Sequence, residues 1–310
     1  MKALITGFRG QDGTYLAEEL RAHGREVIGF TRSESGNLDA GRIHSVDYRD
    51  GRALGDLLDE IRPEEIYHLA SPSCIRDTLE YEKEILAICV DTTLIFLRWI
   101  TDRSPATRFF FAGSAEIYGD PVVSPQNEST PCHPENPYAV AKLTGRELCA
   151  TFRKTHGVFA SSGILFNHES PLRRADFVTR RITQGVAAIV AGESRELVLG
   201  NLDALRDWSH AADFARAFRL TLEASHADDF VFASGKNHSV REFCEEAFAA
   251  AGLDFRDYVR VDPAFYRPDF AQARLGDSRK ALRELAWKPK IGFKELVDEM
   301  LRHDLEVVRR

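Results

Sequence analysis

The sequence predicts an α/β fold, in which a doubly wound parallel sheet is accompanied by a smaller C-terminal domain. Over the first half of the chain, short apolar runs alternate with amphipathic helical patterns, a rhythm typical of a parallel sheet with helices on both faces. After about Asn167 this alternation loosens into helical patterns separated by proline-containing segments. The length of 310 residues fits about two domains. We therefore expect one domain over residues 1–165 and another over 166–310, with some later segments returning to the first.

The expected elements follow from these runs in chain order. The strands of the first domain are Ala3–Ile5, Glu26–Phe30, Arg42–Val46, Ile66–Leu69, Arg108–Ala112 and Ala160–Phe166. Its helices are Thr14–Ala22, Arg52–Ile61, Ile85–Ile100 and Tyr138–Lys154. The helices of the second domain are Phe177–Ala191, Ala211–Ala224, Val240–Ala251 and Phe293–Val307. The helix at 52–61 ends before Arg62-Pro63, because the residue preceding a proline is pushed out of the helical region.

Composition and charge exclude several classes of protein. A net charge of −7 argues against nucleic acid as a partner. The five cysteines form no C-x-x-C pair, which argues against a disulfide framework or a structural zinc site and for a reducing compartment. No uncharged apolar stretch is long enough to span a membrane, and the N-terminal apolar stretch is too short for a signal peptide. We expect a cytoplasmic protein that binds no metal, because its histidines have no convincing ligand spacing.

The first strand leads directly into a G-x-x-G-x-x-G loop that is followed by a helix. In such a loop, glycines let the backbone turn tightly and approach a pyrophosphate at the positive N-terminus of the helix. The alternative is an ordinary strand-to-helix turn, but the position at the start of the chain favours dinucleotide binding. The cofactor-binding residues predicted here are Gly7, Arg9, Gly10, Gln11, Asp12 and Gly13.

The residues after the second strand indicate which dinucleotide is bound. An NAD site usually carries an acid there for the ribose 2′-hydroxyl, whereas this chain continues Thr31-Arg32-Ser33. A guanidinium suits a 2′-phosphate, so Arg32 favours NADP; otherwise Arg32 is a solvated loop charge. Asp47 is placed to accept a hydrogen bond from the adenine amine. Further residues assigned to the cofactor site are Tyr48, Leu69, Ala70 and Ser71.

A second group of residues predicts catalysis. Tyr138 and Lys142 lie four residues apart, and therefore on one face of the expected helix. A neighbouring ammonium lowers the pKa of a phenol, so Tyr138 is expected to act as a general base. Ser114 follows the apolar run Phe109–Ala112, at the strand end where open α/β sheets place their chemistry.

These motifs resemble those of the extended short-chain dehydrogenases/reductases, and within them the GDP-mannose 4,6-dehydratase family. The resemblance extends over almost the whole chain. Its blocks are Ala3–Gly7, Gly10–Gly13, Pro137–Leu143, Ile164–Pro171, Phe177–Arg180, Leu199–Ala204, Arg206–Trp208 and His238–Phe243. The Asn-His-Glu-Ser-Pro and Gly-Asn-Leu-Asp-Ala blocks are narrow markers of enzymes that act on GDP-sugars. The fold implied is a Rossmann domain with a nucleotide-sugar-binding domain.

The resemblance also implies a role for each catalytic residue. Tyr138 takes the proton of the sugar 4-hydroxyl while C4 passes a hydride to NADP, and Ser114 hydrogen-bonds the sugar oxygen. Lys142 holds the nicotinamide ribose. Glu116 removes the C5 proton, water leaves from C6 and the hydride returns to C6. Considered by itself, Glu116 would be interpreted as an ordinary surface charge. Its position two residues after Ser114 is what favours a catalytic role for it.

Cofactor and substrate contacts are implied in the same way. His168 and Arg173 would contact NADP. Without the resemblance, His168 would be interpreted as a buried structural histidine. The GDP portion would be held by Asn167, Arg181, Arg206 and Arg267. Relatives pair helices equivalent to Ile85–Ile100 and Tyr138–Lys154 across a two-fold axis, which implies a homodimer or homotetramer.

The sequence departs from the family at several positions near the sugar. Ala115 replaces a serine in the family's Ser-Thr-Ser-Glu, and Pro72, Cys74 and Glu84 also differ. Gly-Ser-Ala-Glu also resembles the related reductases of GDP-4-keto-6-deoxymannose, although the Asn-His-Glu-Ser-Pro block argues against a reductase. An NADPH-dependent reductase, an NADP-binding sensor without turnover, and a GDP-heptose substrate therefore stand as alternatives.

Overall fold

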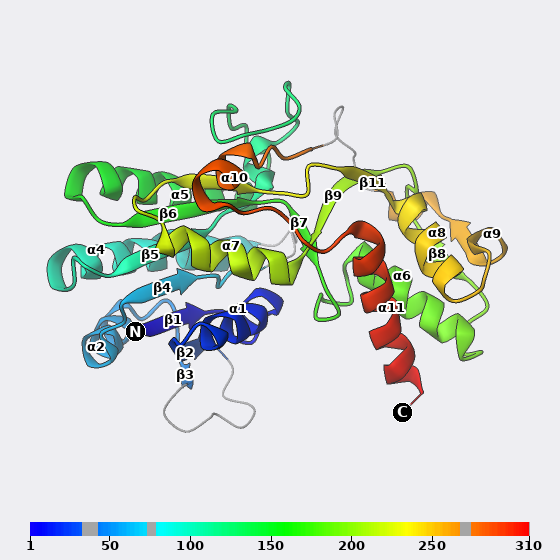
Figure 1. The fold of residues 1–310 in the computed structure, drawn as a ribbon, viewed down its shortest axis with the longest axis horizontal. Coiled ribbons are helices and arrows are strands. Elements are labelled where there is room, and N and C mark those ends of the chain that lie inside the picture. The colour runs from blue at the N-terminus through cyan, green and yellow to red at the C-terminus, as the bar shows by residue number, and fades with distance from the viewer. Residues whose placement is uncertain (33–42, 73–78, 267–273, 310) are drawn as a thin grey trace.

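A seven-stranded parallel sheet forms the centre of the molecule (Figure 1). The computed structural model describes residues 1–32, 43–72, 79–266 and 274–309. The strand order is β10-β6-β5-β4-β1-β2-β3. The strands are β1 (Lys2–Thr6), β2 (Glu26–Thr31), β3 (Ile43–Ser45), β4 (Glu65–His68), β5 (Arg108–Ala112), β6 (Ala160–Leu165) and β10 (Asp229–Phe232). The chain reverses its direction of winding between β1 and β4, where open parallel sheets bind their ligands.

Helices cover both faces of this sheet. On one face, α1 (Gln11–Ala22), α7 (Ala211–Glu223) and α10 (Arg279–Leu285) bury an apolar cluster that includes the ring pairs of Phe110 with Phe218 and of Phe232 with Trp287. On the other, α2 (Gly51–Ile61), α4 (Thr93–Arg103) and α5 (Pro137–His156) pack on β4 and β5. Strands buried on both faces explain the nearly continuous apolar runs in the sequence.

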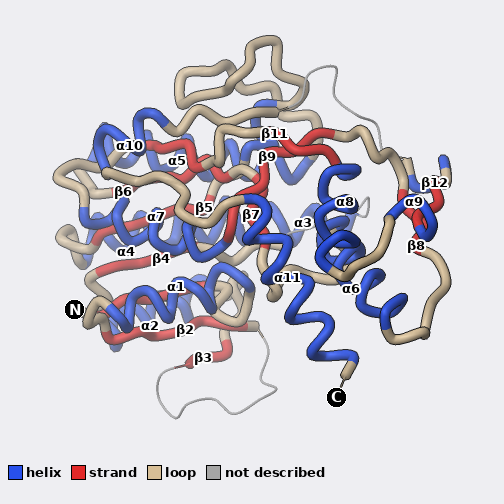
Figure 2. Tube along the Cα trace, turned by 45° about the vertical axis from the view of Figure 1, so that its right-hand side comes forward, coloured by secondary structure: helices blue, strands red, loops and turns tan. Residues whose placement is uncertain are grey.

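A smaller lobe lies beyond the carboxyl ends of the strands, on the right of Figure 1. It contains α6 (Val178–Val190), α8 (Val240–Ala250), α11 (Phe293–Val308) and the short α9 (Phe255–Tyr258) around their own apolar core. Two small sheets adjoin these helices (Figure 2): β7 (Asn167–Glu169), β9 (Leu205–His210) and β11 (Asn237–Ser239), and the pair β8 (Leu197–Leu199) and β12 (Val259–Val261). Although they follow residue 165, α7, β10 and α10 pack with the large sheet.

The expected helices and the strands of the first half are present, with differences that have physical causes. The first helix begins at Gln11 rather than Thr14, because Gly10 caps it and Gln11 and Asp12 form its first turn. The expected helix Ile85–Ile100 is part of a longer run: α3 (Leu79–Leu86), a π-helical segment (Ala87–Thr92) and α4. The Thr92 hydroxyl stabilises the wide turn by donating to the carbonyl of Ala87.

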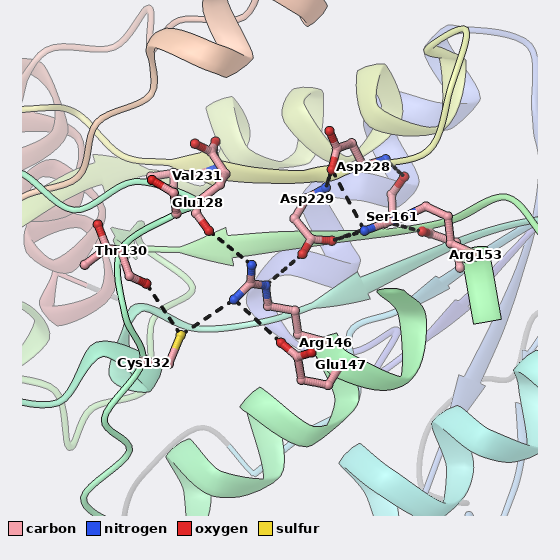
Figure 3. A network of polar contacts seen from close by, with 12 residues as sticks. Glu128, Thr130, Cys132, Arg146, Glu147, Arg153, Ser161, Asp228, Asp229 and Val231 are labelled. Carbon is pink, nitrogen blue, oxygen red and sulfur yellow. Dashed lines mark hydrogen bonds and ion pairs between the residues drawn. The ribbon is translucent and has the colours of Figure 1, made fainter. Parts of the chain in front are cut away.

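Ion pairs fasten the edge strand β10 to α5 (Figure 3). Asp229 binds Arg146 at 2.7 Å and Arg153 at 3.2 Å, both from α5. Glu128 accepts a hydrogen bond from the backbone N–H of Val231 at 2.8 Å. Because the Asp229 carboxylate is buried and met by two guanidinium groups, losing either partner would leave a poorly compensated charge. The network fixes the helix that carries Tyr138 and Lys142.

Among the described residues, no helix is both long and apolar enough to cross a membrane.

Candidate active site

The glycine loop opens onto a cavity of about 370 Å³ at the carboxyl ends of β1, β2 and β4. Most of the predicted cofactor-binding residues line it: Gly7, Arg9, Gly10, Gln11, Asp12, Gly13, Arg32, Tyr48, Leu69, Ala70, Ser71 and Arg173. Sequence reasoning missed the further lining residues Thr31, Ile88, Leu172, Arg174 and Phe177. Of these, Arg174 adjoins a predicted residue, and a search for clustered basic groups would have found it.

Glycine is required in this loop by close backbone contacts. Gly7 has a φ of +69°, and a Cβ there would lie 3.0 Å from the backbone of Ala70. A Cβ on Gly13 would lie 2.6 Å from the carbonyl oxygens of Gly7 and Phe8. The chain therefore passes tightly from β1 into α1 and directs the N-terminus of α1 at the cavity. This cradle, with guanidinium groups around it, fits the diphosphate of a dinucleotide.

Behind the loop, a polar network joins α1 to β7. His168 binds the Phe166 carbonyl at 2.8 Å and Asp12 at 3.0 Å, and its ring stacks on Phe214. Ser170 donates to Gln11 at 2.7 Å. Burial by itself raises the pKa of Asp12, but attraction to His168 and hydrogen bonds from His168 and Gln11 outweigh it and lower the pKa to about 2. These side chains hold the loop in place.

The residues predicted to contact the adenosine half have partners within the protein. Arg32 forms an ion pair with Glu84. Asp47 is exposed and binds Arg49 at 2.9 Å, and hydrogen bonds from Arg49 lower the pKa of Asp47 to about 2. The Tyr48 hydroxyl donates to the Phe30 carbonyl at 3.1 Å and accepts from the Gly7 amide at 3.2 Å.

Arg173 also lines the cavity. Its guanidinium is 3.2 Å from the buried Glu169 carboxylate and 3.7 Å from the centre of the Phe177 ring. Glu169 in turn accepts a hydrogen bond from Thr179 at 2.6 Å. The charge of Arg173 is thus held at the junction of the two lobes.

The catalytic residues predicted from the sequence meet where β5 ends and α5 begins. Asn136 caps α5, which packs so closely on β5 that a Cβ on Gly145 would lie 2.3 Å from the Phe111 ring. This contact brings the buried Lys142 to β5, where its Nζ donates to the Ala112 carbonyl at 2.8 Å. The same Nζ lies 5.6 Å from the centre of the Tyr138 ring.

Ser114 reaches Tyr138 from the end of β5. It caps the short 3₁₀ segment Ala115–Tyr118, its hydroxyl accepts from the Glu116 amide at 3.2 Å, and it lies close enough to Tyr138 to lower the pKa of that phenol. Burial nevertheless raises the pKa of Tyr138 above its ordinary value, and the opposing effects of Lys142 and Ser114 offset this only in part. Lys142 acts on the pKa of Tyr138 in the direction expected from the sequence, and burial acts against it; the role of Tyr138 as general base stays a prediction.

Glu116 is positioned by a residue that sequence reasoning missed. Its Oε1 lies 2.7 Å from Nη1 of Arg274, with exposed side-chain fractions of 28% and 12% respectively. Glu116 is also close enough to Tyr138 to raise the pKa of that phenol. Arg274 belongs to no motif and is far from Glu116 along the chain, so no local pattern could have predicted the pair.

Of the residues predicted to bind the GDP portion, the three that the structure describes lie in the smaller lobe. Asn167 pairs with Trp208 between β7 and β9. Arg181 donates to the Val198 carbonyl at 3.1 Å and lies over the Phe265 ring, and Arg206 donates to the Leu205 carbonyl at 2.7 Å. Arg267 lies outside the described residues, as do Ser33 and Cys74.

One cluster of possible metal ligands occurs among the described residues. His226, Asp228 and Glu284 place one ligand atom each within 4.8 Å of one another. The ammonium of Lys280 lies 2.6 Å from the Asp228 carboxylate and balances its charge.

The glycine loop after the central strand β1 and the group formed by Ser114, Tyr138 and Lys142 define an extended short-chain dehydrogenase/reductase. Solved structures share the fold: the UDP-glucose 4-epimerase of Thermotoga maritima with UDP-glucose has a TM-score of 0.87 at 21% identity, covering 99% of this chain and 100% of that chain. The structure of RMD from Pseudomonas aeruginosa complexed with NADPH has a TM-score of 0.84 at 24% identity, covering 99% of each chain.

The sequence itself identifies the family. Residues 4–300 match the family model described as GDP-mannose 4,6 dehydratase. GDP-mannose 4,6 dehydratase 2 of Arabidopsis thaliana is 39% identical, over 99% of this chain and 88% of that protein. This chain belongs to the GDP-mannose 4,6 dehydratase family and is a nucleotide-sugar dehydratase of the short-chain dehydrogenase/reductase superfamily.

Proposed function

We propose that this chain converts a GDP-mannose-like substrate to its GDP-4-keto-6-deoxy sugar, using NADP that is regenerated in each turnover. The observation that carries the proposal is the meeting of Tyr138, Ser114 and Lys142 with the carboxylate of Glu116 at one strand end. An oxidation at C4 needs the first three groups. An elimination across C5 and C6 needs a further base, which Glu116 supplies.

The cavity at the glycine loop is the proposed NADP site, and the smaller lobe is the proposed site for the GDP portion. Arg9, Arg32 and Arg173 line the cavity and favour a ligand with several phosphate charges. Binding of the 2′-phosphate would require Arg32 to exchange its contact with Glu84 for the phosphate. Residues 1–165 and 166–310 correspond to these two roles, with α7, β10 and α10 supporting the cofactor side.

Tyr138 and Lys142 perform the first proton transfer. NADP, when bound, supplies a hydride acceptor for C4 and later the donor for C6. The Tyr138 oxygen takes the proton of the 4-hydroxyl as the C4 carbonyl forms, and Ser114 hydrogen-bonds the same oxygen. Lys142 favours the phenolate by its charge, and its anchor at the Ala112 carbonyl keeps it close to Tyr138.

Glu116 performs the elimination. The C4 carbonyl acidifies the C5 proton, which passes to the Glu116 carboxylate while the C6–oxygen bond breaks. The departing oxygen takes up a proton and leaves as water. After the hydride is restored at C6, C5 is protonated again. The sugar therefore loses one water. The protons removed from the 4-hydroxyl and from C5 are balanced by the proton taken up by the departing oxygen and the proton added back at C5.

This proposal is tested by incubating the protein with GDP-mannose and NADP. We expect a product lighter by one water, with no net change in nicotinamide absorbance, and weaker activity when NAD replaces NADP. Stoichiometric consumption of NADPH with a GDP-4-keto-6-deoxy sugar would instead identify a reductase, the alternative suggested by the Gly-Ser-Ala-Glu stretch that ends at Glu116. Binding of NADP without turnover of any GDP-sugar in a panel would support the sensor alternative.

The proposed assembly is a homodimer or homotetramer formed through the helical face that carries α3, α4 and α5. Exposed apolar side chains support it: Leu86 from α3, Leu94 from α4 and Val140 from α5. A face of this kind is typical of a contact between subunits. Sedimentation analysis should give at least a dimer, and Leu94→Glu should weaken it.

A further inference from the structure

We propose that Arg274 is the positioning residue of the elimination step: it holds the carboxylate of Glu116 so that the second carboxylate oxygen takes the C5 proton. This inference rests on the proposed function and adds a residue to it. The two side chains come from different parts of the chain, the first from the segment that follows residue 273 and the second from the 3₁₀ segment after β5.

The contact itself is a short, charge-assisted one. Arg274 Nη1 lies 2.7 Å from Glu116 Oε1, and the two side chains are only 12% and 28% exposed. Partial shielding from water strengthens such a contact relative to a surface ion pair. The arginine engages Oε1, so we assign the proton transfer to Oε2. A carboxylate held in one orientation loses less conformational freedom on reaching the transition state.

The backbone that carries Arg274 is fixed on its C-terminal side. Leu275 forms two hydrogen bonds with the fully buried Gln126, at 2.7 Å and 2.9 Å. The Gly276 amide donates to the buried Asp207 carboxylate at 3.2 Å. A Cβ on Gly276 would lie 2.2 Å from the Cβ of Ala233, so the segment is also tightly packed. The backbone next to Arg274 is therefore anchored on its C-terminal side by hydrogen bonds and close packing.

Glu116 is fixed in a similar manner. Its amide donates to the Ser114 hydroxyl at 3.2 Å, and its carbonyl accepts from the Gly119 amide at 3.1 Å. The amide of His133 donates to the carbonyl of Ile117 at 2.9 Å and holds the 3₁₀ segment from outside. Rigid supports on both sides are what a preorganised catalytic group requires. A purely structural ion pair would need no such placement beside Tyr138.

The test compares Arg274→Met with Arg274→Lys in the full-length protein loaded with NADP. For Arg274→Met we expect kcat to fall by about 10- to 100-fold while KM changes by less than about threefold, because orientation and charge are lost at a step after binding. Since C4 oxidation is retained, reduced nicotinamide should accumulate in a single turnover, and solvent deuterium should enter C5 more slowly. Lysine restores the charge, so Arg274→Lys should recover part of kcat.

Arg279→Met provides the matched control. Arg279 is the first residue of α10, shortly after Arg274 in the chain; it is 82% exposed and pairs with Asp277. This control should behave like the unmodified protein. Unchanged kcat and unchanged deuterium exchange in Arg274→Met would overturn the inference. Equal losses of activity and of cofactor affinity in Arg274→Met and Arg274→Lys would also overturn it, because they would indicate a structural role for Arg274. If Arg274→Met does not fold, Arg274→Lys and Arg274→Gln test the role of Arg274 by the same two measurements, kcat and the entry of solvent deuterium at C5.

These outcomes separate the inference from the proposed function. If the unmodified protein releases no keto-deoxy sugar from any GDP-sugar, the proposed function fails. If it releases that product and Arg274→Met does so equally fast without accumulating reduced nicotinamide, only the role of Arg274 fails.

Discussion

The glycine-loop end and the catalytic end of the site are built by different means. At the glycine loop, backbone geometry forms the cradle, and the side chains of Gln11, Asp12 and His168 bond to one another behind it. At the catalytic end, the side chains themselves form the site. They come from the end of β5, from α5 and from the segment after residue 273.

This difference explains why the local sequence predicts the glycine loop better than it predicts the catalytic end. A cradle made of backbone depends on glycines spaced within one short segment of the chain, so a short motif predicts it. A site made of side chains depends on contacts between distant segments, and a motif predicts only the members that share one element. Changes at the catalytic end should therefore affect individual chemical steps, whereas changes at the loop should affect binding and stability together.

The largest expected effect is that of Tyr138→Phe. Removing the phenolic oxygen leaves the 4-hydroxyl without its proton acceptor, so turnover should fall by about a thousandfold. No reduced nicotinamide should form in a single turnover, and NADP affinity should stay within about twofold. Rapid-mixing absorbance and a binding titration check both. Normal formation of reduced nicotinamide would mean that another group takes this proton.

Glu116→Gln should have the next largest effect and should stop the reaction at a later step. Product formation should fall by about a hundredfold because the amide cannot accept the C5 proton. Oxidation at C4 should persist, so reduced nicotinamide forms while solvent deuterium stays out of C5. Mass spectrometry of the recovered sugar measures the exchange. Deuterium at C5 in this variant would assign the base to a different residue.

Gly13→Ala should affect the loop end as a unit. The added Cβ meets two carbonyl oxygens at 2.6 Å, so the loop must shift. We expect a loss of about 1–3 kcal/mol in the free energy of unfolding and a weakening of NADP binding by about tenfold. Gly55→Ala in α2 is the control, since no atom lies within 4 Å of its added Cβ. Equal NADP affinity in the two variants would argue against the cradle.

The smallest expected effect is the pH dependence of the free energy of unfolding that comes from His68, at the end of β4. Burial lowers the pKa of His68 to about 3, so the folded protein keeps this imidazole neutral while the unfolded chain protonates it near 6.5. Its contribution to stability is complete above pH 6.5 and is lost as the pH falls toward 3. Between pH 7.5 and 5.5 this loss is about 1 kcal/mol.

Urea unfolding at these two pH values measures the His68 contribution. In His68→Gln the difference between the two free energies of unfolding should be smaller by about 1 kcal/mol than in the unmodified protein. An identical pH dependence in both proteins would show that His68 is not kept neutral by the fold.

The sequence predicted the glycine loop and six of the seven strands of the large sheet, but not its edge strand β10. Strands such as β5 are continuous apolar runs because both faces are buried, and its predicted bounds agree with the structure. The strand β9 was also not predicted, and β7, β8, β11 and β12 were missed because three residues cannot show an alternating pattern. The Arg274–Glu116 pair was missed because the two residues are far apart in the sequence and meet only in the folded protein.

The central claim is that one bound sugar is oxidised at C4 and reduced at C6 within the same site. GDP-mannose carrying deuterium at C4 tests it most directly, with the protein, NADP and mass spectrometry of the product. We predict that the deuterium is found at C6 of the 4-keto-6-deoxy sugar formed in the same turnover. Product without this label at C6, or label recovered only in released NADPH, would contradict the account.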